Sequence, residues 1–163
     1  QNRLNLLRHV EAADRMIEVT HDVDFIVSCV TNPLVWDKLT DDGAPELYYP
    51  PLGAGIMWVR AGDDGVFLLV EQNHVTYEVH TILLPRARGR AVEIGKEALK
   101  WAFANTKAKR IITNVPETNQ LALRLAKKVG FKQYGINQKS FQKNGVLYDQ
   151  FVLGISKEDV CQQ

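Results

Sequence analysis

The sequence predicts one mixed α/β domain over residues 1–163, with a mostly antiparallel sheet of about six to seven strands and helices on both faces. Three observations predict this fold class. The length suits a single domain. Three strand-like segments follow one another in the middle of the chain, and consecutive strands pair antiparallel. A long amphipathic segment, 88–106, then separates two strand-like segments and provides a crossover between parallel strands.

The first part of the chain combines one strand, one interrupted helix and a long loop. Segment 15–22 has a strand-like centre, whereas 1–15 fits either a short helix or an extension. Segment 22–39 has apolar residues at helical spacing, and Pro33 interrupts or restarts that helix. Segment 40–55 is rich in Gly, Pro and Asp, which predicts a loop long enough to serve a function.

Three predicted strands occupy the centre of the chain. Segments 55–61 and 65–72 flank a Gly-Asp-Asp turn, which favours a hairpin. Segment 75–84 alternates and is rich in β-branched and aromatic residues, as expected of a third strand.

The second half of the chain alternates helices with strands. Segment 88–106 has a broad apolar face typical of a helix packed on a sheet. Segment 108–116 is a short buried strand, and 117–130 is a second helix that Gly130 ends. The chain closes with two further predicted strands, 131–141 and 145–156.

Charge and cysteine content argue against several classes of protein. The formal net charge of +1 gives no reason to expect a nucleic-acid partner. No apolar run approaches the ~20 residues of a membrane-spanning helix, so we expect a soluble, cytoplasmic protein without a membrane partner. Cys29 and Cys161 lie far apart and suggest reduced thiols. The histidines show no metal-ligand spacing with cysteine, so no metal site is expected.

A cationic turn separates the third central strand from the helix that follows. In the stretch LLPRARGRAVEIGKEALKWAF, Pro85 ends the strand and the helix begins near Arg88. The first amides of a helix lack partners and carry partial positive charge. Gly89 allows a ligand to approach the backbone, and three arginines add full charge: Arg86, Arg88 and Arg90. These features favour a diphosphate site. An ordinary strand-to-helix turn with solvated arginines also explains them.

Three motifs in order resemble the GNAT N-acetyltransferase superfamily. They are the stretch just quoted, then RIITNVPETNQLALRLAKKVGF, then YGINQKSFQKNGVLYDQFVLGI. The resemblance covers roughly residues 75–156 and is closest to the branch of RimJ and RimL, which acetylate the N-termini of ribosomal proteins. Acetyltransferase-like proteins of bacteriophages are similar too. The resemblance implies the GNAT fold.

The same resemblance implies acetyl-coenzyme A as the cofactor and a set of residues to hold it. The pyrophosphate would lie on the amides of the turn and of the first helical residues, Arg88, Gly89, Arg90, Ala91, Val92 and Glu93. The pantetheine arm would follow a free strand edge at Ile82, Leu83 and Leu84. Asn119 matches the asparagine that contacts this arm, and Lys127 or Lys128 would meet the 3′-phosphate.

The turn departs from the family pattern, R-G-x-G-x-G/A. Read from Arg88, its second glycine is Ala91 and its third small residue is Glu93, a carboxylate unfavourable beside a diphosphate. An earlier register, Arg86-x-x-Gly89-x-Ala91, fits a shorter form of the pattern. The residues do not decide between the two registers.

Two ionisable residues, Glu78 and His80, are the candidate catalytic bases. They alternate onto one face of the strand that the resemblance puts beside the thioester. A protonated amine is not nucleophilic, so a base must remove its proton, and histidine suits proton transfer near neutral pH. The alternative is that His80 packs with a satisfied ring and Glu78 is a surface residue. The family's usual acids are missing, since Ala122 and Ala126 occupy their positions. Tyr134 or Tyr148 could substitute, or the thiolate could leave unassisted or through water.

The resulting hypothesis is an acetyl-CoA-dependent N-acetyltransferase that acts by direct transfer on a primary amine. The amine belongs to a protein N-terminus or to a small molecule. By resemblance, the acceptor is held by residues 36–38, Tyr48 and Tyr49, and by the closing hairpin at 139–144. The alternative is a GNAT-fold binding or structural protein with weak or no catalysis. Homodimer formation is left open.

Overall fold

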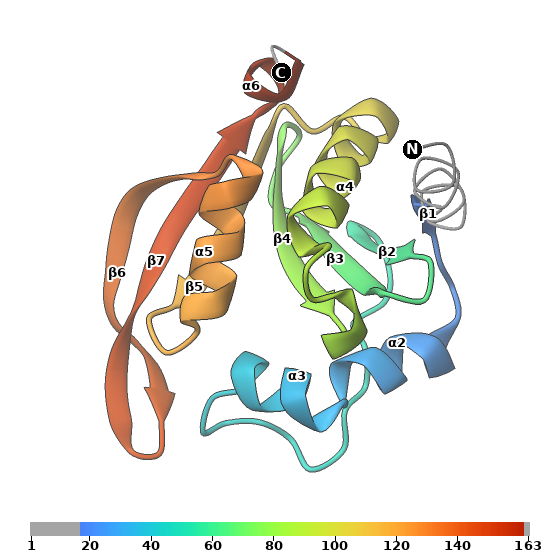
Figure 1. Cartoon of the computed structure of the whole chain (residues 1–163). Coiled ribbons are helices and arrows are strands. Elements are labelled where there is room, and N and C mark those ends of the chain that lie inside the picture. Colours follow the sequence, from blue (N-terminus) through green and yellow to red (C-terminus); the bar gives the residue numbers. More distant parts are fainter. Residues whose placement is uncertain (1–16, 162–163) are drawn as a thin grey trace, which may run out of the picture.

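The computed structural model describes residues 17–161, and the segment 1–15 lies outside the described residues. Within that part of the chain, the strands form one seven-stranded sheet in the order β1-β2-β3-β4-β5-β7-β6 (Figure 1). The strands are β1 (Ile17–Val19), β2 (Ile56–Ala61), β3 (Gly65–Glu71), β4 (Thr76–Leu83), β5 (Arg110–Pro116), β6 (Lys132–Lys143) and β7 (Val146–Ser156).

One strand pair is parallel and the others are antiparallel. β4 and β5 pair in parallel, with Thr76 opposite Arg110 and Glu78 opposite Ile112. The helix α4 (Ala91–Asn105) makes the crossover between them. The neighbouring pairs β3–β4 and β5–β7 are antiparallel over their whole registers. The mixed, mostly antiparallel sheet predicted from the sequence is therefore confirmed.

Helices cover both faces of the sheet (Figure 1). α4 and α5 (Gln120–Val129) lie on one face, where they bury Tyr77 and Val79 of β4 in the larger core. α2 (Val23–Val30) and α3 (Pro33–Leu39) lie on the other face, over a second core that contains Ile82. Because successive side chains of a strand point to opposite faces, β4 contributes odd-numbered residues to the first core and even-numbered residues to the second.

The helix ends follow the local sequence signals. The helix predicted over 22–39 is two helices, because Asn32 caps α3 by accepting from the Leu34 amide and Pro33 takes the first helical position, where its missing N–H costs nothing. Asn119 caps α5 through its side chain, and Gly130 ends α5 with φ of +123°, as predicted. The short helix α6 (Lys157–Cys161) was not predicted.

The predicted core strands agree with the structure to within a few residues at their ends. None of the helices between residues 17 and 161 combines the length and the apolar character needed to span a bilayer. In the same part of the chain, no group of three His, Cys, Asp or Glu residues is placed to bind a metal ion.

Candidate active site

A cleft opens where β4 and β5 separate. Their pairing stops at Glu78 and Ile112, although both strands continue. At the point of separation the Thr113 hydroxyl donates to the Val79 carbonyl at 3.0 Å. The cleft has a volume of about 720 Å³ and is lined from both faces of the sheet, by α4 and α5 on one side and by α3 on the other. A molecule bound here would therefore pass through the sheet.

The register of β4 decides which of its backbone groups face the cleft. The Leu84 amide donates to the Asp64 carbonyl at 2.8 Å, on the side of β3. Antiparallel pairing alternates along a strand, so Ile82 also directs its backbone groups to β3, whereas Thr81 and Leu83 direct theirs to the cleft. The backbone groups of Ile82 and Leu84, predicted to face the pantetheine arm, therefore face β3 instead. Of the three predicted residues Leu83 faces the cleft, together with Thr81.

The cationic turn forms a short 3-10 helix, η1 (Pro85–Ala87), before α4 begins. The Arg88 amide donates to Pro85 and the Arg90 amide to Ala87, so neither is available to a ligand. Gly89 has φ of +84°, a conformation that favours glycine, and a Cβ there would meet open space. The helix therefore starts immediately after a turn whose surface at Gly89 is unobstructed.

The first turn of α4 presents amides to the cleft. The Ile94 amide donates to the Arg90 carbonyl and begins the hydrogen-bond ladder of the helix. Ala91 and Val92 precede it, and both line the cleft. Their amides lie at the positive end of a 15-residue helix, which suits an anion.

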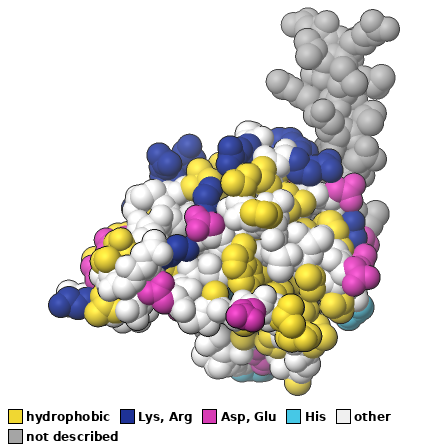
Figure 2. Space-filling view, turned by 90° about the horizontal axis from the view of Figure 1, so that it is seen from below, with side chains coloured by type: hydrophobic (Ala, Val, Ile, Leu, Met, Phe, Trp, Pro, Cys, Tyr) yellow, Lys and Arg dark blue, Asp and Glu magenta, His cyan; other side chains and the backbone are white. Residues whose placement is uncertain are grey.

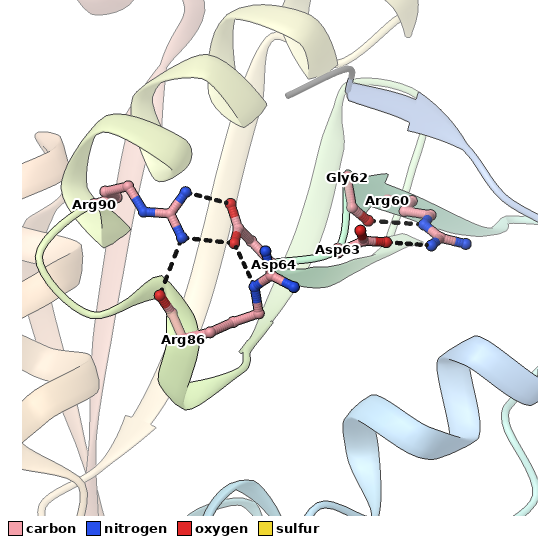
Figure 3. Close-up of polar contacts among 6 residues, drawn as sticks. All are labelled: Arg60, Gly62, Asp63, Asp64, Arg86 and Arg90. Carbon is pink, nitrogen blue, oxygen red and sulfur yellow. Dashed lines mark hydrogen bonds and ion pairs between the residues drawn. The ribbon is translucent and has the colours of Figure 1, made fainter. Parts of the chain in front are cut away.

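A buried carboxylate, Asp64, holds two arginines of the turn (Figure 3). Arg90 donates to both of its oxygens, at 2.8 and 3.2 Å, and also donates to the Arg86 carbonyl at 3.0 Å. The Arg86 guanidinium lies 3.3 Å from the same carboxylate, which is only 5% exposed. The Arg90 side chain, predicted to face a diphosphate, is instead fixed against Asp64, because a buried carboxylate requires a cationic partner.

The other residues predicted for the cofactor divide into two groups. The lining of the cleft includes Leu83, Leu84, Arg88, Gly89, Ala91, Val92, Asn119 and Lys128. It does not include Ile82, Arg90, Glu93 or Lys127. Glu93 is exposed, so its carboxylate does not obstruct the cleft. The sequence reasoning missed Arg124, one helical turn before Lys128 on α5; their i, i+4 spacing could have indicated a shared face.

The two candidate bases form a pair. His80 Nε2 lies 3.0 Å from Glu78 Oε1, and the His80 ring, 44% exposed, lines the cleft. The hydrogen bond from His80 lowers the pKa of Glu78; partial burial opposes that change, and a hydrogen bond from Asn114 adds to it. Both residues lie on the even-numbered face of β4, toward α3. Asn114, on β5, faces them across the separation and was missed because nothing in its own segment distinguishes it.

The predicted acceptor elements are bound to one another. Lys143, near the tip of the β6–β7 hairpin, donates to the carbonyls of Asp37 and Thr40. The Asp42 carboxylate accepts from the amides of Asn144 and Gly145, at 2.7 and 2.9 Å. The start of the loop 40–55 is therefore docked on the hairpin, and its acidic side chains are partly used there.

No tyrosine lines the cleft among residues 17–161. Tyr134, one proposed substitute for the missing acid, is exposed on β6, where the Arg110 guanidinium lies 5.5 Å from its ring. Tyr148 lies on β7 and is likewise absent from the lining. The structure brings neither residue to the cleft.

The chain belongs to the acetyltransferase (GNAT) domain family, whose pattern matches residues 5–132, well over half of the chain. Membership in this family places the chain in a class of acetyltransferases that use acetyl-CoA as the donor. Solved structures share the fold at low identity. A spermidine N-acetyltransferase from Vibrio cholerae, in complex with CoA and spermine, is 18% identical with a TM-score of 0.72, over 91% of this chain and 99% of that one.

A second structure, provisionally named a phosphinothricin N-acetyltransferase, is also 18% identical, with a TM-score of 0.69 over 86% of this chain and 97% of that one. At such identity these structures show the fold alone. None of the curated proteins is significantly similar to this chain.

Proposed function

We propose that this protein transfers an acetyl group from acetyl-CoA to a primary amine, of a small molecule or a protein N-terminus, as in the RimJ and RimL branch. One observation carries the proposal. A single cleft joins a cationic end at α4 and α5 to the Glu78–His80 pair. The cationic end suits a polyanionic cofactor, and the pair suits removal of a proton from an amine.

The residues of the cationic end fit the cofactor's chemistry. The amides of Ala91 and Val92 and the Arg88 guanidinium would hold the diphosphate. Arg124 and Lys128, exposed cations on α5, would meet the 3′-phosphate. The backbone of Thr81 and Leu83 offers the hydrogen bonds of an unpaired strand to an arm that carries amide groups. Bound there, acetyl-CoA supplies the acetyl group as a reactive thioester.

The Glu78–His80 pair would deprotonate the acceptor. When His80 Nε2 donates to Glu78, Nδ1 keeps a lone pair that can accept the ammonium proton directly or through water. Glu78 fixes the orientation of the ring and stabilises the imidazolium that forms. Glu78 is ready for this role because its lowered pKa keeps it ionised.

A second function, ligand binding with weak or no catalysis, is favoured because the described part of the chain brings no tyrosine to the cleft as an acid. Ala122 and Ala126 both lie on α5, and no tyrosine from residues 17–161 replaces the missing acid. Water would then have to protonate the departing thiolate. The two functions share the cofactor site and differ in turnover.

Calorimetric titration with acetyl-CoA, beside an acceptor screen, tests both functions. Binding that weakens in Arg88→Ala, together with turnover lost in His80→Ala, supports the enzyme. Undiminished binding without turnover on any amine supports the binding protein. If millimolar acetyl-CoA gives no heat, the cofactor site as proposed is wrong.

A further inference from the structure

The described residues that line the cleft include cations and no carboxylate. Among residues 17–161, its ionisable lining consists of Lys38, His80, Arg88, Arg124 and Lys128, with no Asp or Glu. Arg88, Arg124 and Lys128 lie toward α4 and α5, at the proposed cofactor end. Lys38 lies on α3, over the other face of the sheet, which is the face of the Glu78–His80 pair and the proposed acceptor end of the cleft.

Three acidic side chains near this acceptor end already have partners, whereas Glu46 on the adjoining loop is exposed. Glu78, which is not part of the cleft lining, lies in hydrogen-bonding contact with His80. Asp37 lies 3.7 Å from the Lys143 ammonium, and the Asp42 carboxylate holds the two hairpin amides. A ligand with several positive charges would have to compete for these carboxylates, and Lys38 would repel it.

The acceptor end is instead apolar at its mouth. Leu34 and Leu39 of α3 line the cleft, although they are 57% and 36% exposed. The adjoining loop exposes Leu47, Tyr49 and Leu52 to a similar or greater extent. Figure 2, seen from below the view of Figure 1, shows hydrophobic side chains gathered on this side of the molecule. Exposed apolar side chains concentrated beside a cleft are characteristic of a binding surface.

We infer that the acceptor is a primary amine carried on an apolar body, and that polyamines such as spermidine are poor acceptors. The inference rests on the proposed acetyl transfer. The single ammonium would reach the Glu78–His80 pair, while the apolar body would cover Leu34 and Leu39 and gain free energy by leaving water. A polyamine gains little from the same surface and carries its additional charges past Lys38.

The test compares acceptors in an assay of CoA thiol release. The panel contains 2-phenylethylamine, n-hexylamine, spermidine, and two peptides that begin with Leu or with Asp. We expect kcat/KM for 2-phenylethylamine or for the Leu peptide to exceed that for spermidine by at least about tenfold. The small amines and the peptides distinguish the two sources of an apolar amine.

Two substitutions should reduce this preference without disturbing the fold. Lys38→Glu and Leu34→Asp place a carboxylate at exposed positions of the acceptor end, and each should lower the ratio of kcat/KM for 2-phenylethylamine over spermidine by about tenfold. Leu147→Asp is the matched control, because Leu147 is 54% exposed and lies outside the lining. That variant should keep the wild-type ratio.

The outcomes separate this inference from the proposed function. Preference for spermidine in the wild-type protein would overturn the inference and leave the acetyl transfer intact. An unchanged ratio in both carboxylate variants would also overturn it. If acetyl-CoA binds but no amine of the panel is acetylated, both the inference and the transferase proposal fail.

Discussion

Arg90 donates two hydrogen bonds to the carboxylate of Asp64, and the same guanidinium donates a third to the Arg86 carbonyl. Asp64 lies in the β2–β3 turn, where its own carbonyl accepts from the Leu84 amide. One buried aspartate therefore ties the end of β4, the turn and the start of α4 together. Read from Arg88, the turn has Ala91 for the second glycine of the family pattern and Glu93 for its third small residue, and this side-chain bridge holds the turn in place.

Asp64→Asn should weaken the use of acetyl-CoA through its diphosphate. The substitution removes the charge that holds both arginines, so the turn loses its fixed conformation. We expect KM for acetyl-CoA to rise about tenfold, equivalent to about 1.4 kcal/mol. KM for acetyl-pantetheine, which has no diphosphate, should not change, and steady-state kinetics with both thioesters measures the difference.

The neighbouring Asp63→Asn is the control for that experiment. Asp63 pairs with Arg60 at 2.9 Å, away from the turn, and is 69% exposed. It should leave both KM values unchanged. Equal losses with both thioesters in Asp64→Asn would show general destabilisation instead of a role in diphosphate binding.

Glu78→Gln should reduce folding stability in a pH-dependent manner. The pKa of Glu78 is lowered in the native state, so its ionised form stabilises the protein above the ordinary pKa of a glutamate. That contribution disappears as the pH falls through the lowered native pKa. We expect the variant to be less stable by roughly 0.5–1 kcal/mol at about pH 7, and this difference to shrink as the pH is lowered to about pH 3.

Urea unfolding at the two pH values measures this effect. Glu46→Gln, on the exposed loop, should leave the free energy of unfolding unchanged at both. A larger stability difference at the acidic pH would contradict the sign of the prediction.

Asp42→Ala should loosen the loop from the hairpin. The variant removes the acceptor for the amides of Asn144 and Gly145, bonds that are individually worth about 1 kcal/mol. Hydrogen exchange at these two amides should accelerate by about fivefold. Asp41→Ala, which removes only a local bond to the Gly43 amide, should leave their exchange unchanged. Unaltered exchange in both variants would mean that the contact contributes nothing in solution.

Gly65→Ala should destabilise the junction of β3 and β4. Gly65 has φ of +149°, and an added Cβ would lie 2.9 Å from Leu83 Cα and press on the Ile82 carbonyl. We expect a loss of roughly 3 kcal/mol or more in thermal or urea unfolding. Gly53→Ala shares a positive φ, +119°, but meets no neighbouring atom, so its loss should be about 1 kcal/mol. If the two variants lost the same free energy of unfolding, backbone strain alone would explain the effect, and the clash with Ile82 and Leu83 would contribute nothing.

The fold could be predicted because its signals are local. The alternation at 75–84, the helical spacing at 88–106 and the stop at Gly130 each depend on residues close in sequence. The order of the elements then limits how the strands pair. The position of β7 between β5 and β6 is set by long-range packing, and the sequence offered no signal for it.

The site was predictable only in part, because its contacts are tertiary. Glu78 and His80 share a strand face, so the period of two already placed them together. Arg90 was assigned to the diphosphate because the sequence shows its charge but not its partner, Asp64, 26 residues earlier. Whether the backbone of Ile82 or of Thr81 faces the cleft depends on the hydrogen-bond register with β3, and the local sequence pattern does not reveal that register.

The short pairing of β4 with β5 leaves the domain as two half-sheets joined at a narrow hinge. Each half is continuous by itself, from β1 to β4 and from β5 to β6. A ligand arm hydrogen-bonded to Thr81 and Leu83 would act as an additional strand on that hinge. Binding of the cofactor would then stabilise the folded state. Without the cofactor the two half-sheets should unfold as separate cooperative units, whereas with acetyl-CoA bound they should unfold together.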